Sequence, residues 1–173
     1  MGLKLSNHFW VKEWFTSPDP AKKEIYRKFL ESTGEKFAKQ NIDHRQTMIL
    51  ERIRAHFNEG NYDLQNGKER KIIVTSGYRF SNPKKPFSSQ HPMGRAVDFV
   101  VEGIDPIDVK LFILNNWKTD PAIRLVRGIE DFEGMTWTHI DVRNSTRIYW
   151  FSRRGSTVSN KFYEALIKNE LMR

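Results

Sequence analysis

Cysteine is absent from this chain of 173 residues. The protein can therefore form neither a disulfide framework nor a thiolate zinc site, and a metal ion would have to be held by His, Asp or Glu. The sequence also lacks any stretch near the roughly 20 apolar residues of a transmembrane helix. Its N-terminus, MGLKLSNHFWVKEWF, has no basic region followed by an apolar run and a small-residue cleavage site. We therefore expect cytoplasmic synthesis without a signal peptide.

Basic residues outnumber acidic ones, with 29 Lys and Arg against 21 Asp and Glu and a formal net charge of +8. This charge favours anionic partners such as nucleic acid, acidic membranes or anionic cell-wall polymers, without choosing among them. The basic residues are spread along the chain in short pairs, such as Lys22-Lys23 and Arg153-Arg154. A solvated surface explains this distribution better than a dedicated nucleic-acid stripe, so we do not expect a nucleic-acid partner. We also expect a monomer.

The length corresponds to about one domain, and the order of the predicted elements favours the α+β class. Apolar residues at helical spacing predict helices over about 21–30, 44–58, 105–117 and 160–172. Apolar runs predict strands over 71–76, 96–101, 123–126 and 137–142, with a loop over 81–90. We expect a single domain over 1–173 with an N-terminal arm (1–20) and a C-terminal helical extension (about 148–173). Its centre would be a small antiparallel sheet flanked by helices.

Two of the five histidines lie in informative settings, and the first is in the segment SQHPMGRAVD over residues 89–98. His91 falls in the predicted loop, and Asp98 falls on the strand that follows it. Gly94 allows a backbone conformation that other residues resist, so the chain can turn between them. The segment therefore predicts that the side chains of His91 and Asp98 meet at one point.

The second informative histidine lies on the predicted strand over 137–142. Because side chains alternate along a strand, one face carries Trp137, His139, Asp141 and Arg143. Two neutral imidazoles and one carboxylate form a sound ligand set for zinc, with a fourth position left for water. From residue types and spacing alone, histidines that are merely hydrogen-bonded explain the pattern equally well.

Three motifs occur in a specific order along the chain. They are Thr75-Ser76-Gly77-Tyr78-Arg79, then Ser89-x-His91-x-x-Gly94-x-Ala96-x-Asp98, and then Thr138-His139-Ile140-Asp141. In this order they resemble the zinc D-alanyl-D-alanine carboxypeptidases and L-alanyl-D-glutamate endopeptidases, a family whose fold is shared by the Hedgehog signalling domain. Residues 5–17 are similar to the N-terminal stretch of its phage-type branch. The resemblance covers about residues 5 to 145.

The resemblance implies a set of site residues. His91, Asp98 and His139 match the ligands of one zinc ion. Arg79 matches an arginine that contacts substrate and helps to polarise the scissile carbonyl, a task suited to a permanently charged group with several donors. A structural salt bridge is the alternative role for Arg79. Ser89 matches a serine that lines the substrate cleft, and a hydroxyl that stabilises a turn is the alternative.

The catalytic base is the point at which the sequence departs from the family. Many relatives carry an acidic residue three positions before the last ligand, where this chain has Thr136, which cannot act as a base at neutral pH. Glu133, in a Gly-containing loop, is our first choice for the base. Asp141 is better interpreted as a group that orients an imidazole, although it stays a candidate base together with Asp131. A chain with no working base is the remaining possibility.

The function implied by the resemblance is that of a zinc metallopeptidase acting on the stem peptides of bacterial peptidoglycan, as a carboxypeptidase or an endopeptidase. A phage-type enzyme of this kind would act at the cell wall after release or as part of a virion. The competing hypothesis is a zinc-binding module without catalysis, such as a phage tail or assembly component. Fold alone does not separate the two, because function depends on the site.

Overall fold

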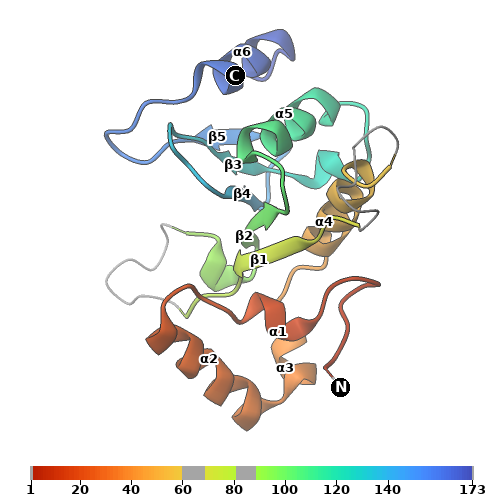
Figure 1. Cartoon of the computed structure of the whole chain (residues 1–173), viewed down its shortest axis with the longest axis vertical. Coiled ribbons are helices and arrows are strands. Elements are labelled where there is room, and N and C mark those ends of the chain that lie inside the picture. The colour runs from red at the N-terminus through yellow and green to blue at the C-terminus, as the bar shows by residue number, and fades with distance from the viewer. Residues whose placement is uncertain (1, 60–68, 81–88, 173) are drawn as a thin grey trace.

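A computed structural model describes residues 2–59, 69–80 and 89–172 of the chain. The fold is α+β, as predicted, with a five-stranded sheet between two groups of helices (Figure 1). The helices are α1 (Val11–Trp14), α2 (Pro20–Thr33), α3 (Glu35–Lys39), α4 (Arg45–His56), α5 (Pro106–Asn116) and α6 (Asn160–Lys168). The strands are β1 (Ile72–Ser76), β2 (Ala96–Val101), β3 (Gly128–Glu130), β4 (Thr138–Asp141) and β5 (Tyr149–Phe151). The predicted loop over 81–90 lies largely outside the described residues.

Local chemistry explains where two of the predicted helices begin. Asp19 and Asp105 each accept a hydrogen bond at 3.0 Å from the amide two residues later, which caps α2 and α5 respectively. A proline follows each aspartate at the first helical position, where its missing N–H costs no hydrogen bond. These two signals are visible in the sequence, and both helices form where they predict.

The strands follow the order β1-β2-β4-β3-β5 across the sheet. Neighbouring strands are antiparallel except β3 and β5, which run parallel, so the sheet is mixed rather than wholly antiparallel as we expected. Partner residues on adjacent strands share a face of the sheet. One such row crosses the whole sheet and consists of Ser76, Asp98, His139, Glu130 and Phe151.

The predicted strand over 123–126 is wrong. Residues Ile123–Leu125 form a short 3-10 helix, η3, and the strand of this region begins three residues later at Gly128. The cause is Asp120, whose carboxylate accepts hydrogen bonds from the amides of Ala122 and Ile123 and so fixes a turn. The apolar run correctly predicted buried residues here, but the hydrogen bonds accepted by the Asp120 carboxylate determined the backbone conformation.

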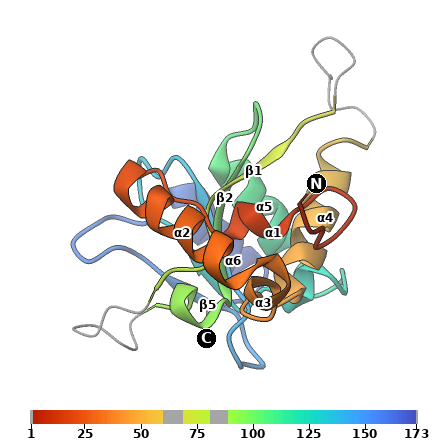
Figure 2. The ribbon, with the colours of Figure 1, turned by 90° about the horizontal axis from the view of Figure 1, so that it is seen from below.

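The core lies against the sheet face opposite the row of polar residues. It contains the buried strand residues Val97, Phe99, Ile129 and Ile140, over which α4 and α5 pack. At the other end of the molecule α1, α2 and α3 lie beside β1, and Figure 2 looks onto this end. The N-terminal arm is thus part of the packed domain, because Val11 and Trp14 of α1 are fully buried.

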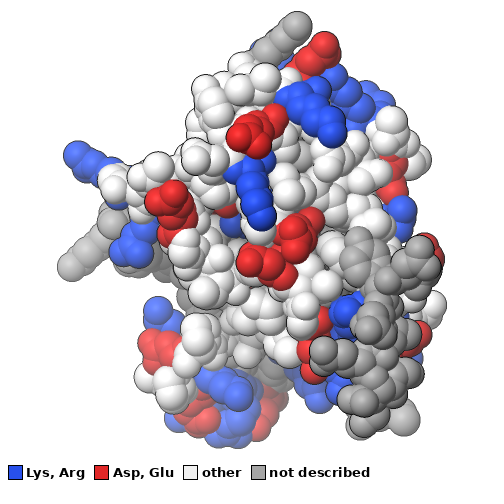
Figure 3. Space-filling view, turned by 45° about the horizontal axis from the view of Figure 1, so that its top comes forward, with Lys and Arg blue, Asp and Glu red and all other residues white. Residues whose placement is uncertain are grey.

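The C-terminal segment is only partly helical, in contrast to the predicted extension. Its first element is β5, which pairs with β3 in the sheet, and α6 follows and packs on α5 through Phe162 and Leu166. Within the described ranges, no helix is both long and apolar enough to cross a bilayer. On the face shown in Figure 3, basic and acidic side chains are interspersed.

Candidate metal centre

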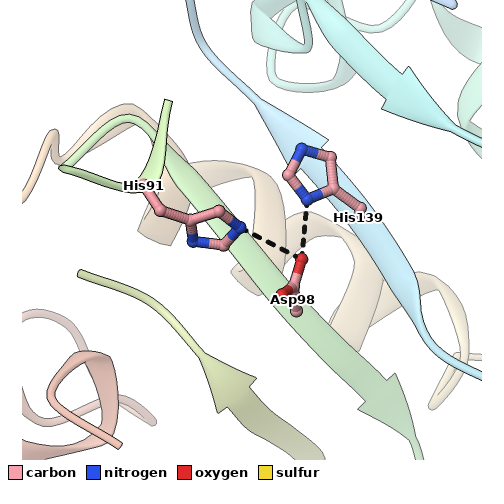
Figure 4. Close-up of side chains that lie close together, drawn as sticks. All are labelled: His91, Asp98 and His139. Atoms are coloured by element: carbon pink, nitrogen blue, oxygen red, sulfur yellow. Dashed lines mark hydrogen bonds and ion pairs between the residues drawn. The ribbon is translucent and has the colours of Figure 1, made fainter. Parts of the chain in front are cut away.

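His91, Asp98 and His139 come together as predicted, each from a different element (Figure 4). His91 is the first residue of the short 3-10 helix η2 (His91–Met93), Asp98 lies on β2 and His139 on β4. Asp98 Oδ1 is 2.6 Å from His139 Nδ1 and 3.3 Å from His91 Nε2. All three residues are buried, with exposed fractions of 2%, 7% and 7% for His91, Asp98 and His139. The three residues can hold a metal ion, because one ligand atom from each lies within 4.8 Å of the others.

The hydrogen bonding of His91 argues that a cation belongs between these groups. His91 Nδ1 lies 2.6 Å from the carbonyl oxygen of Gly77. A carbonyl only accepts, so Nδ1 carries the proton and Nε2 of the neutral ring presents a lone pair. That lone pair faces Asp98 Oδ1, which is also an acceptor. Two acceptors aimed at one another in a buried site repel unless a cation lies between them, and ligating histidines commonly donate their other ring N–H in this way.

The protonation states of the three residues also favour a cation between them. Burial lowers the pKa of His91 and so favours its neutral form. Burial alone would raise the pKa of Asp98, but the hydrogen bond from His139 outweighs it and holds the pKa well below its usual range. Burial likewise opposes the charged form of His139, yet its contacts with Asp141 and Asp98 raise its pKa to about 9. At neutral pH His139 of the metal-free site therefore carries a proton on both ring nitrogens, and a metal ion would displace one of these protons.

Asp141 lies beside His139 and is itself held firmly. Its Oδ2 is 3.9 Å from His139 Nε2, and its carboxylate forms a two-pronged ion pair with the guanidinium of Arg143. Burial raises the pKa of Asp141, but the hydrogen bonds from Arg143 lower it to about 2, so the carboxylate stays charged. Arg143 in turn lies over the rings of Tyr149 and Phe151 on β5. This chain of contacts holds the Asp141 carboxylate beside His139, and its role in orienting the imidazole stays a prediction.

Gly128 makes room for the Asp141 carboxylate, so we expect Gly128→Ala to weaken metal binding. An alanine Cβ at this position would lie 2.1 Å from Asp141 Oδ2, and the pair with Arg143 leaves the carboxylate little freedom to move. Loss of an orienting group typically costs about 10–100-fold in metal affinity. Competition with a chromophoric zinc chelator measures this loss. Gly2→Ala is the control, since its Cβ would meet only ordinary contacts at 3.5 Å or more, and equal affinities in the two variants would contradict the role given to Asp141.

The N-terminal helices support the two loops that carry His91 and Arg79. Gly94 has the left-handed φ of +63° that its place in the motif predicted, and a Cβ there would lie 1.6 Å from the carbonyl oxygen of Asn41. Gly77 also approaches α1 closely, with a Cβ position 2.6 Å from the carbonyl oxygen of Trp14. Both motif glycines are therefore needed for close backbone contact.

Arg79 and Ser89 both line the cavity at the metal centre, which has a volume of about 470 Å³. The Arg79 guanidinium pairs with Asp98 Oδ2 and donates from Nε to Ser76 Oγ at 2.9 Å, while 45% of its side chain stays exposed. Ser89 Oγ accepts a hydrogen bond at 3.3 Å from the amide of His91 and so also stabilises the turn. A second cavity, of about 480 Å³, shares Arg79, Asp98 and Trp137 with the first. Arg79 thus lies where the two cavities meet.

The three candidate bases, which are Glu133, Asp131 and Asp141, are dispersed. Glu133 is exposed in the turn after β3, its amide donates to the carbonyl of Thr157, and it is not among the described residues that line either cavity. Asp131 is buried and accepts from Lys110 Nζ and from the amide and hydroxyl of Ser159, each at 2.8 Å. Thr136 lines the second cavity. Only Asp141 of the proposed bases lies at the metal centre.

No family model, curated protein or solved structure matches this chain. One further residue of the site, Glu130, was not predicted from the sequence and lines the cavity together with the three ligand candidates. Glu130 is the cross-strand partner of His139 in the antiparallel pair of β3 and β4. A predicted hairpin of these two strands would therefore have placed Glu130 at the site.

Proposed function

We propose that this protein is a zinc-dependent peptidase that hydrolyses amide bonds in the stem peptides of bacterial peptidoglycan, as a phage-type lytic enzyme. The observation that carries the proposal is the buried group of His91, Asp98 and His139, in which lone pairs of a ring nitrogen and a carboxylate face each other. The order of the motifs around these residues supports the assignment to peptidoglycan. Such an enzyme would act at the bacterial cell wall after release or as part of a virion, where its positive charge would favour an anionic polymer.

The donor set favours zinc over the hard cations. Magnesium and calcium prefer oxygen ligands, whereas two imidazoles and a carboxylate are typical of zinc sites and also of iron(II) oxygenases. The resemblance of the surrounding motifs supports zinc. Elemental analysis of the purified protein would distinguish the two metals directly.

In the proposed hydrolysis, the metal ion and the residues of the chain have separate roles. Bound zinc would supply a Lewis acid for the amide carbonyl and for the attacking water. Arg79, at the junction of the two cavities, is placed to donate hydrogen bonds to the carbonyl oxygen as negative charge develops on it. The peptide would extend into the two cavities on either side of Arg79, with Trp137 contributing to the wall of both.

Arg79→Ala is expected to keep its zinc and to lose about 10²–10³-fold in kcat, the usual cost of removing one donor to a developing oxyanion. Zinc content and the rate of fragment release from peptidoglycan measure the two effects. Arg153→Ala removes an exposed arginine outside both cavities and is the matched control. A wild-type rate in Arg79→Ala would leave this residue with only its structural ion pair to Asp98.

The function itself is tested by incubating the zinc-loaded protein with purified peptidoglycan and analysing the released fragments by mass spectrometry. We expect stem-peptide fragments whose new termini identify the bond that is cut, and no release after treatment with a chelator. Full zinc content without release of fragments would contradict the peptidase and favour a zinc-binding module of a phage tail or assembly.

A further inference from the structure

Glu130 occupies the position next to His139 in the row of residues that crosses the sheet. It is the direct partner of His139 on the neighbouring strand β3, so the two side chains rise from the same face. It is partly exposed and lines the cavity that contains His91, Asp98 and His139. A carboxylate therefore stands beside the proposed metal ligands on a regular strand rather than on a loop.

Among the carboxylates of this cavity, Glu130 differs in its contacts. Asp98 is engaged by both histidines and by Arg79, and Asp141 is engaged by Arg143. Within the described part of the chain, the Glu130 side chain has no hydrogen bond or ion pair. Its oxygens are thus available to a water molecule or a substrate, whereas those of the other two carboxylates are already occupied.

The acidic residues that follow Glu130 in the sequence do not face the cavity. Asp131, the next residue, points to the opposite face of the sheet because side chains alternate, and there it pairs with Lys110 of α5. Glu133 lies beyond the end of the strand in the exposed turn, outside the cavity. The acidic segment of residues 130–133 therefore offers the site one carboxylate, that of Glu130.

We propose that Glu130 is the general base of the hydrolysis, an inference that rests on the proposed peptidase function. The oxygen of the attacking water forms a bond to the amide carbon while one of its protons passes to the Glu130 carboxylate. The carbon–nitrogen bond then breaks, and Glu130 returns that proton to the leaving amine. Peptide and water yield a carboxylic acid and an amine, and Glu130 ends as it began.

The experiment compares Glu130→Gln with Glu133→Gln, because glutamine keeps the shape of glutamate and cannot accept the proton. Zinc content, calorimetric binding of an intact synthetic stem peptide, and kcat for its cleavage are measured on each. We expect Glu130→Gln to hold one zinc and bind the peptide while kcat falls about 10²–10⁴-fold, the usual contribution of general acid–base catalysis. Glu133→Gln should retain wild-type values in all three measurements.

The outcomes separate the two proposals. Wild-type kcat in Glu130→Gln would overturn the role of Glu130 and leave the peptidase intact. Loss of zinc or of peptide binding in Glu130→Gln would also overturn it, since the residue would then act by positioning other groups. A zinc-loaded wild type that cleaves neither the peptide nor peptidoglycan would overturn the proposed function, and with it the catalytic role of Glu130.

Discussion

His139→Ala is expected to reduce zinc from one ion per chain to near zero after dialysis. The remaining pair, His91 and Asp98, would offer only two ligands, fewer than the three protein ligands of a typical catalytic zinc site. The loss is compounded because Asp98 Oδ1 contacts both histidines and would lose the closer of its two imidazole partners. Elemental analysis of the dialysed protein measures the effect, and His91→Ala should behave in the same way.

The matched control for these variants is His44→Ala. His44 is exposed at the start of α4, and its side chain makes no capping hydrogen bond. It should therefore retain full zinc content, which shows that loss of metal is not a general effect of removing a histidine. Stoichiometric zinc in His139→Ala would contradict the proposal that His91, Asp98 and His139 hold the metal ion.

Asp131→Ala is expected to lower the free energy of unfolding by about 3–5 kcal/mol, the range found when one partner of a buried ion pair is removed. Lys110 and Asp131 are only 1% and 2% exposed, and Lys110 Nζ lies 2.8 Å from the carboxylate. Without Asp131, the buried ammonium of Lys110 would keep, among the described residues, only the contact with Met135 Sδ at 3.2 Å. The substitution also removes the acceptor for the amide and hydroxyl of Ser159, at the start of α6. Urea denaturation measures the change.

The double variant Lys110→Met/Asp131→Leu tests the cause. Replacing both charges with apolar side chains of similar size leaves no unpaired charge, so most of the stability should return. A loss of less than about 1 kcal/mol in Asp131→Ala alone, as for an exposed pair, would contradict the burial of this ion pair. Zinc content should stay unchanged in both variants, because Asp131 faces away from the metal centre.

The resemblance of the motifs implied the set of three candidate ligands, and local determinants explain how each of them is presented. The strand alternation around His139 and the turn allowed by Gly94 are properties of short segments, and a φ of +63° at Gly94 confirms the second. Likewise, the aspartate and proline before α2 and α5 act within one helical turn. For these features the sequence pattern was sufficient.

The features that could not be predicted depend on one side chain that fixes a turn and on contacts between distant segments. The Asp120 cap displaced the expected strand over 123–126, so the register that places Glu130 beside His139 was not foreseen. β5 pairs in parallel with β3, and no pattern in the two sequence segments predicts that they are neighbours in the sheet. Asp131, a candidate base, forms a buried ion pair with Lys110 and so has a structural role. The periodicity of the sequence does not distinguish an acidic residue that pairs with a buried lysine from one that is exposed to solvent.

The position of β4 has a consequence for synthesis on the ribosome. β4 lies between β2 and β3 in the sheet, yet it emerges after both, and His139 follows Asp98 by 41 residues. A nascent chain that has not reached β4 has an unpaired edge on β2, the kind of edge that invites pairing with other chains. It also has only two of the three candidate metal ligands. Translation of β4 removes both deficits together, so the growing chain joins β2 to β3 and gains the third candidate ligand in one event.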